Sequence, residues 1–141
     1  MRKFLLAFCV ALLAAGCNIV LAADDALYRA LGEQAGLQRL STDFVARLKA
    51  DAQIGHHFKD VKAKALAESL ASQFCKVSGG PCEYEGAPMK LAHQDLEITR
   101  ADFNRLVEVL QDTMNAQGIA FGDQNRLLAL LAPMHRDIIN R

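Results

Sequence analysis

The chain has 141 residues, 52% hydrophobic and 23% charged, which is enough for one small domain and too short for two independent cores. Its 16 lysine and arginine residues equal its 16 acidic residues, so no basic excess points to nucleic acid or to an anionic membrane surface. Only 3 prolines and 9 glycines are present, which argues against a disordered or low-complexity chain.

Residues 1–23 have the layout of an export leader. A positively charged start, Met1-Arg2-Lys3, precedes the unbroken apolar run Phe4–Ala15, as in secretory signal peptides. The leader holds two basic residues and no acidic one, so residues 24–141 carry 14 basic and 16 acidic side chains, a net charge of −2. We therefore expect a domain at residues 24–141 that is exported, and is periplasmic or membrane-anchored facing the periplasm.

Three fates of this leader fit the sequence. The small residues of Val20–Ala23 suit ordinary signal peptidase. Leu13–Cys17 resembles a bacterial lipobox, in which Cys17 would be lipidated, although Ala14 stands where leucine is preferred. The stretch Phe4–Ala23 is also about long enough to span a bilayer as a retained anchor. The last two alternatives would attach the protein to a membrane through its N-terminus.

Two cysteines, Cys75 and Cys82, lie outside the leader, seven residues apart around a Gly-Gly-Pro turn. In an oxidising compartment they can approach disulfide distance, although two unpaired thiols fit the same sequence. Their spacing is not that of a zinc site, and no second pair of cysteines or histidines flanks them.

Helical periodicity dominates the rest of the chain, and no segment shows the sustained alternation of a strand, so we expect an all-α fold. Apolar stripes, glycine stops and a Thr99-x-x-Asp102 capping box set the expected boundaries. The expected helices are a short one ending at Leu31-Gly32, then Gly36–Ala50, Lys62–Val77, Met89–Gln94, Thr99 to Gly118, and Asp123–Ile139 with a kink at Pro133.

Four histidines are the remaining candidates for chemistry. His56 and His57 are adjacent, so they make a poor metal clamp and fit solvated loop residues better. His135 fits the polar side of the last helix. His93 differs, because it lies among apolar residues of a short helix between two apolar walls, where one imidazole could ligate a flat apolar cofactor. A half-buried histidine with a purely structural role fits the same spacing.

From Leu27 to about Ile139 the chain resembles the truncated haemoglobins, most closely group I. The motifs that carry the resemblance occur in family order and with close to family spacing. They are Leu27-Tyr-Arg-Ala-Leu-Gly32, Asp43-Phe44, Phe58, Gly79-Gly80-Pro81, Tyr84-x-Gly86, Met89-Lys-x-Ala-His93, Ile98-Thr99 with Asp102-Phe103, and Leu131-Ala-Pro133.

The resemblance implies a two-over-two helical sandwich around haem b. His93 matches the proximal histidine that ligates the iron, and Phe58 matches the phenylalanine packed on the haem face. Phe44 would precede the distal position of the second helix, and Phe74 would lie beside the distal pocket. Lys90 could meet a haem propionate, although an exposed lysine fits equally well.

The predicted distal pocket departs from the family. Val45 stands where the family usually has tyrosine, and Leu66, Leu70 and Phe74 occupy positions where relatives often carry a polar group; Leu106 would close the far side. Bound oxygen is retained by hydrogen-bond donors, each worth about 1–3 kcal/mol where charge is involved. A pocket without donors predicts fast oxygen loss or autoxidation, and a relative preference for nitric oxide or carbon monoxide.

The expected function is binding of a diatomic ligand, O2, NO or CO, at a pentacoordinate iron, in a sensor, scavenger or redox partner with a reductant that the sequence does not identify. One alternative is a haem enzyme with peroxidase-like or NO-converting activity, which would need a positioned distal proton donor. Another is a haem-free helical module that binds a partner or an apolar ligand.

Overall fold

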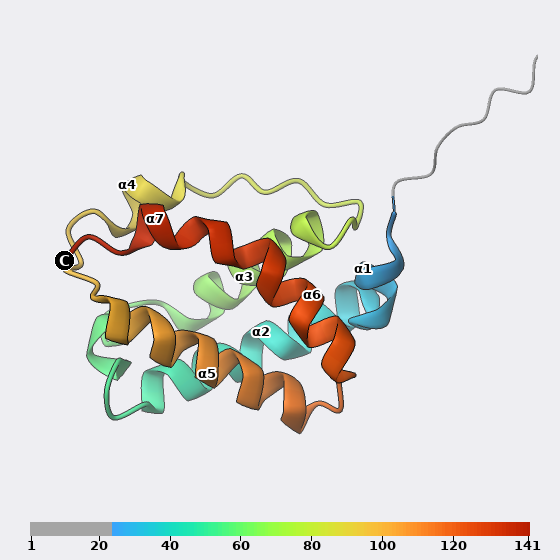
Figure 1. The fold of residues 1–141 in the computed structure, drawn as a ribbon, viewed down its shortest axis with the longest axis horizontal. Helices are drawn as coiled ribbons and strands as arrows, with labels where there is room; N and C mark the ends of the chain where they lie inside the picture. The colour runs from blue at the N-terminus through green and yellow to red at the C-terminus, as the bar shows by residue number, and fades with distance from the viewer. Residues whose placement is uncertain (1–23) are drawn as a thin grey trace, which may run out of the picture.

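The computed structural model describes residues 24–141, so the predicted leader lies outside the described residues. Within this range the chain forms seven α-helices and two short 3₁₀ helices and no strand, which confirms the all-α prediction. In chain order the elements are α1 (Ala26–Ala30), α2 (Glu33–Ala50), η1 (Gly55–Phe58), α3 (Ala63–Val77), α4 (Met89–His93), α5 (Arg100–Ala116), α6 (Phe121–Leu131), η2 (Ala132–Met134) and α7 (His135–Ile138) (Figure 1).

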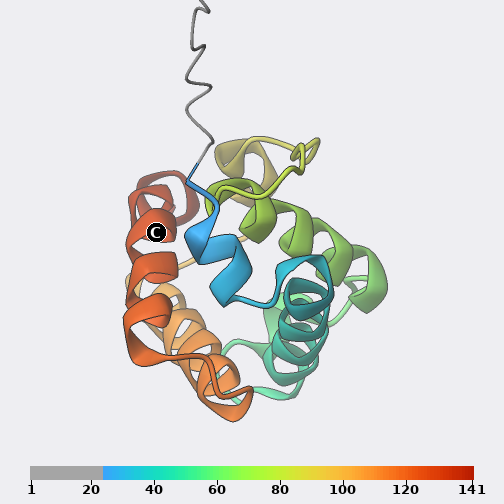
Figure 2. The same ribbon diagram turned by 90° about the vertical axis from the view of Figure 1, so that its right-hand side faces the viewer.

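Two pairs of helices form two layers around the core. Seen end-on, α2 and α3 lie on one side and α5 and α6 on the other, with α1 at the near end (Figure 2). The core between them is almost entirely apolar, and half of its members are leucine. Its buried residues are Leu27, Leu31, Leu37, Leu40, Phe44, Leu48, Ile54, Ala71, Phe74, Cys75, Val109, Leu110, Met114 and Leu127.

The helix predicted at Gly36 begins three residues earlier, at Glu33. Gly32 has a φ of 83°, a left-handed conformation that costs glycine little, and this turn lets α2 follow α1 directly. Gly36 lies inside α2, at a position where the backbone oxygen of Leu31 comes close. A Cβ at residue 36 would lie 2.1 Å from that oxygen, so only glycine fits there. Gly36 thus serves close packing rather than helix initiation.

The predicted capping box starts α5. The Asp102 backbone N–H donates to Thr99 Oγ1 at 3.1 Å, and the Thr99 N–H donates to Asp102 Oδ2 at 3.0 Å. These reciprocal bonds satisfy two backbone N–H groups that the first turn would leave without partners.

Pro133 interrupts the last predicted helix. The chain runs as α6 to Leu131, narrows to the 3₁₀ helix η2 around the proline and resumes as α7. Proline lacks an N–H and its ring clashes with the preceding turn, so a break at this position is the expected result.

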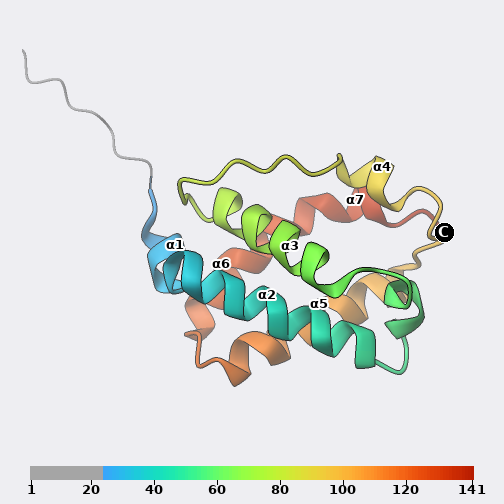
Figure 3. The ribbon, with the colours of Figure 1, turned by 180° about the vertical axis from the view of Figure 1, so that it is seen from behind.

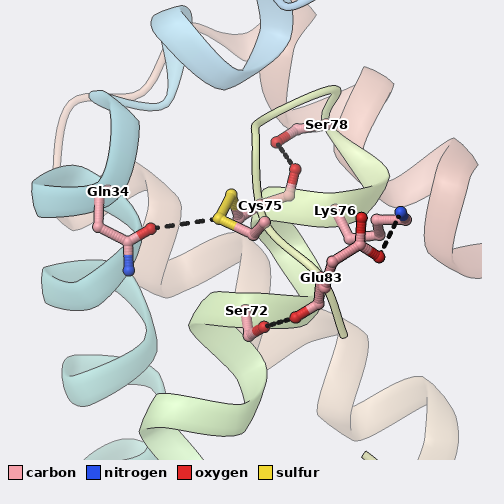
Figure 4. The surroundings of a disulfide bond; sticks show 7 residues. Gln34, Ser72, Cys75, Lys76, Ser78 and Glu83 are labelled. Carbon is pink, nitrogen blue, oxygen red and sulfur yellow. Dashed lines mark hydrogen bonds and ion pairs between the residues drawn. A yellow bond between two sulfur atoms is a disulfide. The ribbon is translucent and has the colours of Figure 1, made fainter. Parts of the chain in front are cut away.

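A disulfide joins Cys75 to Cys82, with 5.8 Å between their Cα atoms (Figure 4). Gly79, with a φ of 88°, reverses the chain after α3. Gly80 leaves room for the bridge, since a Cβ there would lie 2.6 Å from Cys75 Sγ and 2.6 Å from the Tyr28 ring. Of the two alternatives that the sequence leaves open, the structure has the disulfide.

None of the helices in residues 24–141 combines the length and the apolar character needed to cross a membrane.

Candidate functional site

His93 ends α4 with a half-buried imidazole ring. Its Nδ1 lies 2.7 Å from the backbone oxygen of Met89, one turn earlier. Because a carbonyl oxygen can only accept, the proton of the neutral ring resides on Nδ1 and Nε2 keeps its lone pair. A ring fixed in this tautomer by a backbone carbonyl is the usual arrangement of a metal-ligating histidine.

The segment that leads to α4 is fastened to α3. Residues 78–88 run back along α3 before α4 begins beside α7 (Figures 1 and 3). Ser72 Oγ donates to the Glu83 backbone oxygen at 2.8 Å, and Lys76 Nζ lies 2.9 Å from Glu83 Oε2 (Figure 4). Together with the disulfide, these contacts fix the first half of the connection, and so limit where α4 and His93 can lie.

The apolar residues predicted for the site fall into two groups by burial. Phe44, Val45 and Phe74 are 1–2% exposed, and Phe44 and Phe74 belong to the core cluster. The second group is only half-buried: Phe58, Leu66, Leu70 and Leu106. Three of these four, Phe58, Leu70 and Leu106, pack against the core cluster. Half-buried apolar side chains from η1, α3 and α5 therefore lie at the border of the core, and each leaves part of its apolar surface uncovered.

The side chains of Asp51 and Lys49 fix the segment that carries Phe58. Asp51 Oδ1 accepts from the backbone N–H groups of Gln53 at 2.9 Å and Ile54 at 3.0 Å, which forms the turn after α2. Its other oxygen, Oδ2, accepts from Arg105 of α5 at 2.9 Å from Nε and 2.8 Å from Nη2. The hydrogen bond from Arg105, followed by that from Ile54, lowers the pKa of the Asp51 carboxyl.

Lys49 is the second anchor of this segment. Its Nζ donates to the backbone oxygens of Phe58 at 2.7 Å, Lys59 at 3.2 Å and Val61 at 2.9 Å. An ammonium group has three protons, so this one cation satisfies three carbonyls at the end of η1. Lys49 thereby holds Phe58 and the start of α3 against the end of α2.

His57 lies in the same segment, and the prediction that it is a solvated loop residue is wrong. Its side chain is only 12% exposed, and Nε2 is buried 3.6 Å from Asp102 Oδ2 without a hydrogen-bond partner. Folding η1 against the start of α5 places the ring there, which spacing along the chain does not reveal. The pKa of Asp102 is lowered, chiefly by the hydroxyl and the N–H of Thr99 and further by the nearby His57.

Two comparisons identify the family. Residues 26–140 match the bacterial-like globins. The chain is also 30% identical over 112 residues to a group 1 truncated haemoglobin of Mycolicibacterium paratuberculosis, covering 79% of this chain and 82% of that protein. The chain belongs to the group 1 truncated haemoglobins.

Solved truncated haemoglobins share this fold. The Fe(III) form of the truncated haemoglobin of Tetrahymena pyriformis aligns with a TM-score of 0.77 at 21% identity, over 82% of this chain and 98% of that one. The 2/2 haemoglobin of a Synechococcus species, in a cyanomet state with covalently attached haem, aligns with a TM-score of 0.76 over the same shares. The predicted globin fold is therefore confirmed.

Membership of the truncated haemoglobins implies a haem cofactor, and the residues present fit one. A haem iron needs one protein ligand within an apolar chamber, and His93 supplies an imidazole whose Nε2 keeps its lone pair. Within residues 24–141, no three histidine, cysteine, aspartate or glutamate side chains converge as they would around a bare metal ion. Phe58, Leu70 and Leu106 offer apolar surface for a flat macrocycle.

Gln73 is a buried polar residue beside α4 that the sequence pattern did not bring out. It is only 8% exposed, and its Nε2 lies 3.3 Å from Met134 Sδ and 3.7 Å from Met89 Sδ. Gln73 follows Leu66 and Leu70 at i+7 and i+3, so helical spacing alone would have placed it on their face of α3. Its amide group points towards α4 and η2.

The other polar candidates lie at the edge of the site. Lys90 is exposed, which fits both a propionate contact and a solvated lysine. His56 is exposed and its ring lies 4.0 Å from that of His57. His135 is half-buried rather than on the surface, with Nδ1 2.8 Å from the Ala132 oxygen and its ring 6.3 Å from Phe103.

Proposed function

We propose that this truncated haemoglobin binds haem b through His93 and a diatomic ligand, O2, NO or CO, on the opposite face of a pentacoordinate iron. The observation that carries the proposal is the bond between His93 Nδ1 and the Met89 oxygen, which leaves Nε2 as the ligating atom. When bound, haem would supply the iron centre for the gas, and the chain would supply His93 as the protein ligand together with apolar side chains around the group.

The remaining pocket residues have separate roles in this proposal. Phe58 packs on the haem, held in place by Lys49. Phe44 and Phe74 support the distal side from the core, and the exposed Lys90 would meet a propionate. Leu106 closes the pocket from α5.

The distal side is proposed to retain oxygen poorly. Val45, Leu66, Leu70 and Phe74 carry no group that can donate a hydrogen bond. The amide of Gln73 lies beside Met89, on the helix of the proximal ligand, rather than among these side chains. Catalysis of the peroxidase or NO-converting kind would require a distal proton donor, so ligand binding is the better-supported function.

We further propose that the protein is exported, with residues 1–23 acting as a cleaved leader, a lipoprotein leader lipidated at Cys17 or a membrane anchor. The disulfide between Cys75 and Cys82 supports an oxidising compartment, where such bonds persist. A reductant that keeps the iron ferrous would then have to act outside the cytoplasm.

Haemin titration tests the proposed function. The unmodified protein should take up one equivalent and develop a Soret band, and carbon monoxide should shift that band after reduction. His93→Ala should lose the spectrum of an axial imidazole, whereas His56→Ala, an exposed histidine, should keep it. A wild-type protein with no Soret band after haemin addition would instead support the haem-free module.

A further inference from the structure

The backbone of His93 is held by a residue 47 positions away in the chain. Asn140 Nδ2 donates to the His93 carbonyl oxygen at 2.5 Å, and the Leu96 N–H donates to the same oxygen at 3.1 Å. A carbonyl oxygen has two lone pairs, so these two donors complete its hydrogen bonding.

Asn140 and its neighbour also hold the turn that follows His93. The backbone N–H groups of Asn140 and Arg141 donate to the Ile98 oxygen at 3.1 and 3.2 Å. Arg141 Nη1 lies 3.5 Å from Glu97 Oε2. Residues 94–97 are therefore held at both ends by Asn140 and at the second end by Arg141 as well.

This turn needs such support, because Glu97 has a φ of 50°. A residue with a Cβ seldom adopts that left-handed conformation, which persists where surrounding contacts over-determine it. α4 itself has only five residues, too few for a helix to be stable without tertiary contacts. The position of His93 thus depends on contacts from outside its own helix.

We propose that Asn140 is a positioning residue for the proximal ligand. The inference rests on the proposed role of His93 as the haem ligand. Met89 fixes the ring of His93 through Nδ1, and Asn140 fixes its backbone through the carbonyl oxygen, so the two contacts together determine where Nε2 lies. α7 packs beside α4, and the residues after it reach across the end of α4 (Figures 1 and 3).

The test compares Asn140→Asp with Asn125→Asp in haem-reconstituted protein. Asn140→Asp keeps the side-chain shape but replaces the donor by an ionised acceptor facing the His93 oxygen. Asn125, exposed on α6, undergoes the same change of charge as the control. We expect haemin transfer to excess apomyoglobin to be about tenfold faster in Asn140→Asp, as loss of a hydrogen bond with an adverse charge predicts. Asn140→Ala should give a smaller increase.

A spectroscopic readout separates positioning from general destabilisation. The iron–imidazole stretching band of the ferrous protein should shift or broaden in Asn140→Asp and stay unchanged in Asn125→Asp. An Asn140→Asp protein with the wild-type band and the wild-type haemin transfer rate would overturn the inference.

A third measurement distinguishes this inference from the proposed function. Amide hydrogen exchange across residues 93–98 of the haem-free protein should be faster in Asn140→Asp than in Asn125→Asp, whether or not haem binds. Failure of the wild-type protein to bind haemin would overturn the proposed function, whereas unchanged exchange in Asn140→Asp would overturn the positioning role of Asn140.

Discussion

Lys49 shows how one side chain on the outside of the fold can organise the pocket. Its ammonium group ties three carbonyls at the end of η1 to α2, and Phe58 lies within that short stretch. Phe58 is half-buried and packs against the core cluster. The orientation of a phenyl ring predicted to cover the haem therefore depends on a residue nine positions earlier.

Lys49→Met should keep the aliphatic stem and lose the three hydrogen bonds. We expect the free energy of unfolding to fall by about 1 kcal/mol, the usual net value of such contacts near solvent. Urea denaturation measures it, with Lys64→Met, a 90% exposed lysine of α3, as the control. Equal urea midpoints for the two variants would show that the carbonyl contacts contribute nothing.

A substitution at Val45 tests the proposal that the distal pocket lacks a hydrogen-bond donor. Val45→Tyr should place a hydroxyl where the family usually has one and slow oxygen dissociation about tenfold, the effect of one hydrogen bond to a charged acceptor. Stopped-flow displacement of oxygen measures the rate, and Val45→Phe controls for ring size. Slow dissociation in the unmodified protein would reveal a donor elsewhere, and Gln73 would be the first residue to replace.

At the scale of helices, the long helices are predicted more accurately from the sequence than the short ones. The sequence predicts α3 and α5 to within one or two residues, because long apolar stripes and a capping box determine them locally. The five-residue α4 is predicted from its motif, but its placement is tertiary. No spacing rule indicates that Asn140 meets His93, that Gln73 turns towards two methionines, or that His57 packs on Asp102, since these contacts join segments far apart in the chain.

The disulfide stabilises the junction between α3 and the segment leading to α4. Because the bond restricts the unfolded chain, closing this short loop should raise the free energy of unfolding by about 2 kcal/mol. Treatment with dithiothreitol should lower the urea midpoint of the wild-type protein accordingly. Cys75→Ser/Cys82→Ser should have the lower midpoint from the start and not respond to the reductant. Identical midpoints in all four samples would contradict a stabilising role.

At the scale of the whole molecule, two carboxyl groups make the free energy of unfolding depend on pH in the acidic range. The pKa values of Asp51 and Asp102 are lowered in the folded protein, by the Arg105 and Thr99 hydrogen bonds respectively. A carboxyl with a lowered folded pKa stabilises the fold at pH values above its unfolded pKa of about 4. That contribution is lost as the pH falls from about 4 through the lower folded pKa.

Asp102→Asn should remove part of this dependence. Its free energy of unfolding should lie below that of the wild-type protein at pH 7, and the difference should shrink as the pH falls below about 4. Urea denaturation over a pH series measures the difference. Asp112→Asn, an exposed aspartate of the same helix, carries the same change of charge and should not reproduce the trend. A difference that stays constant down to acid pH would contradict the role of Asp102.

Resonance Raman spectroscopy of the ferrous, ligand-free protein tests most directly whether His93 Nε2 ligates a haem iron. We predict an iron–imidazole stretching band in the wild-type protein that disappears in His93→Ala and returns when imidazole is added. A haem-loaded His93→Ala protein that keeps the wild-type band without added imidazole would contradict ligation by His93, because another residue would then be the ligand.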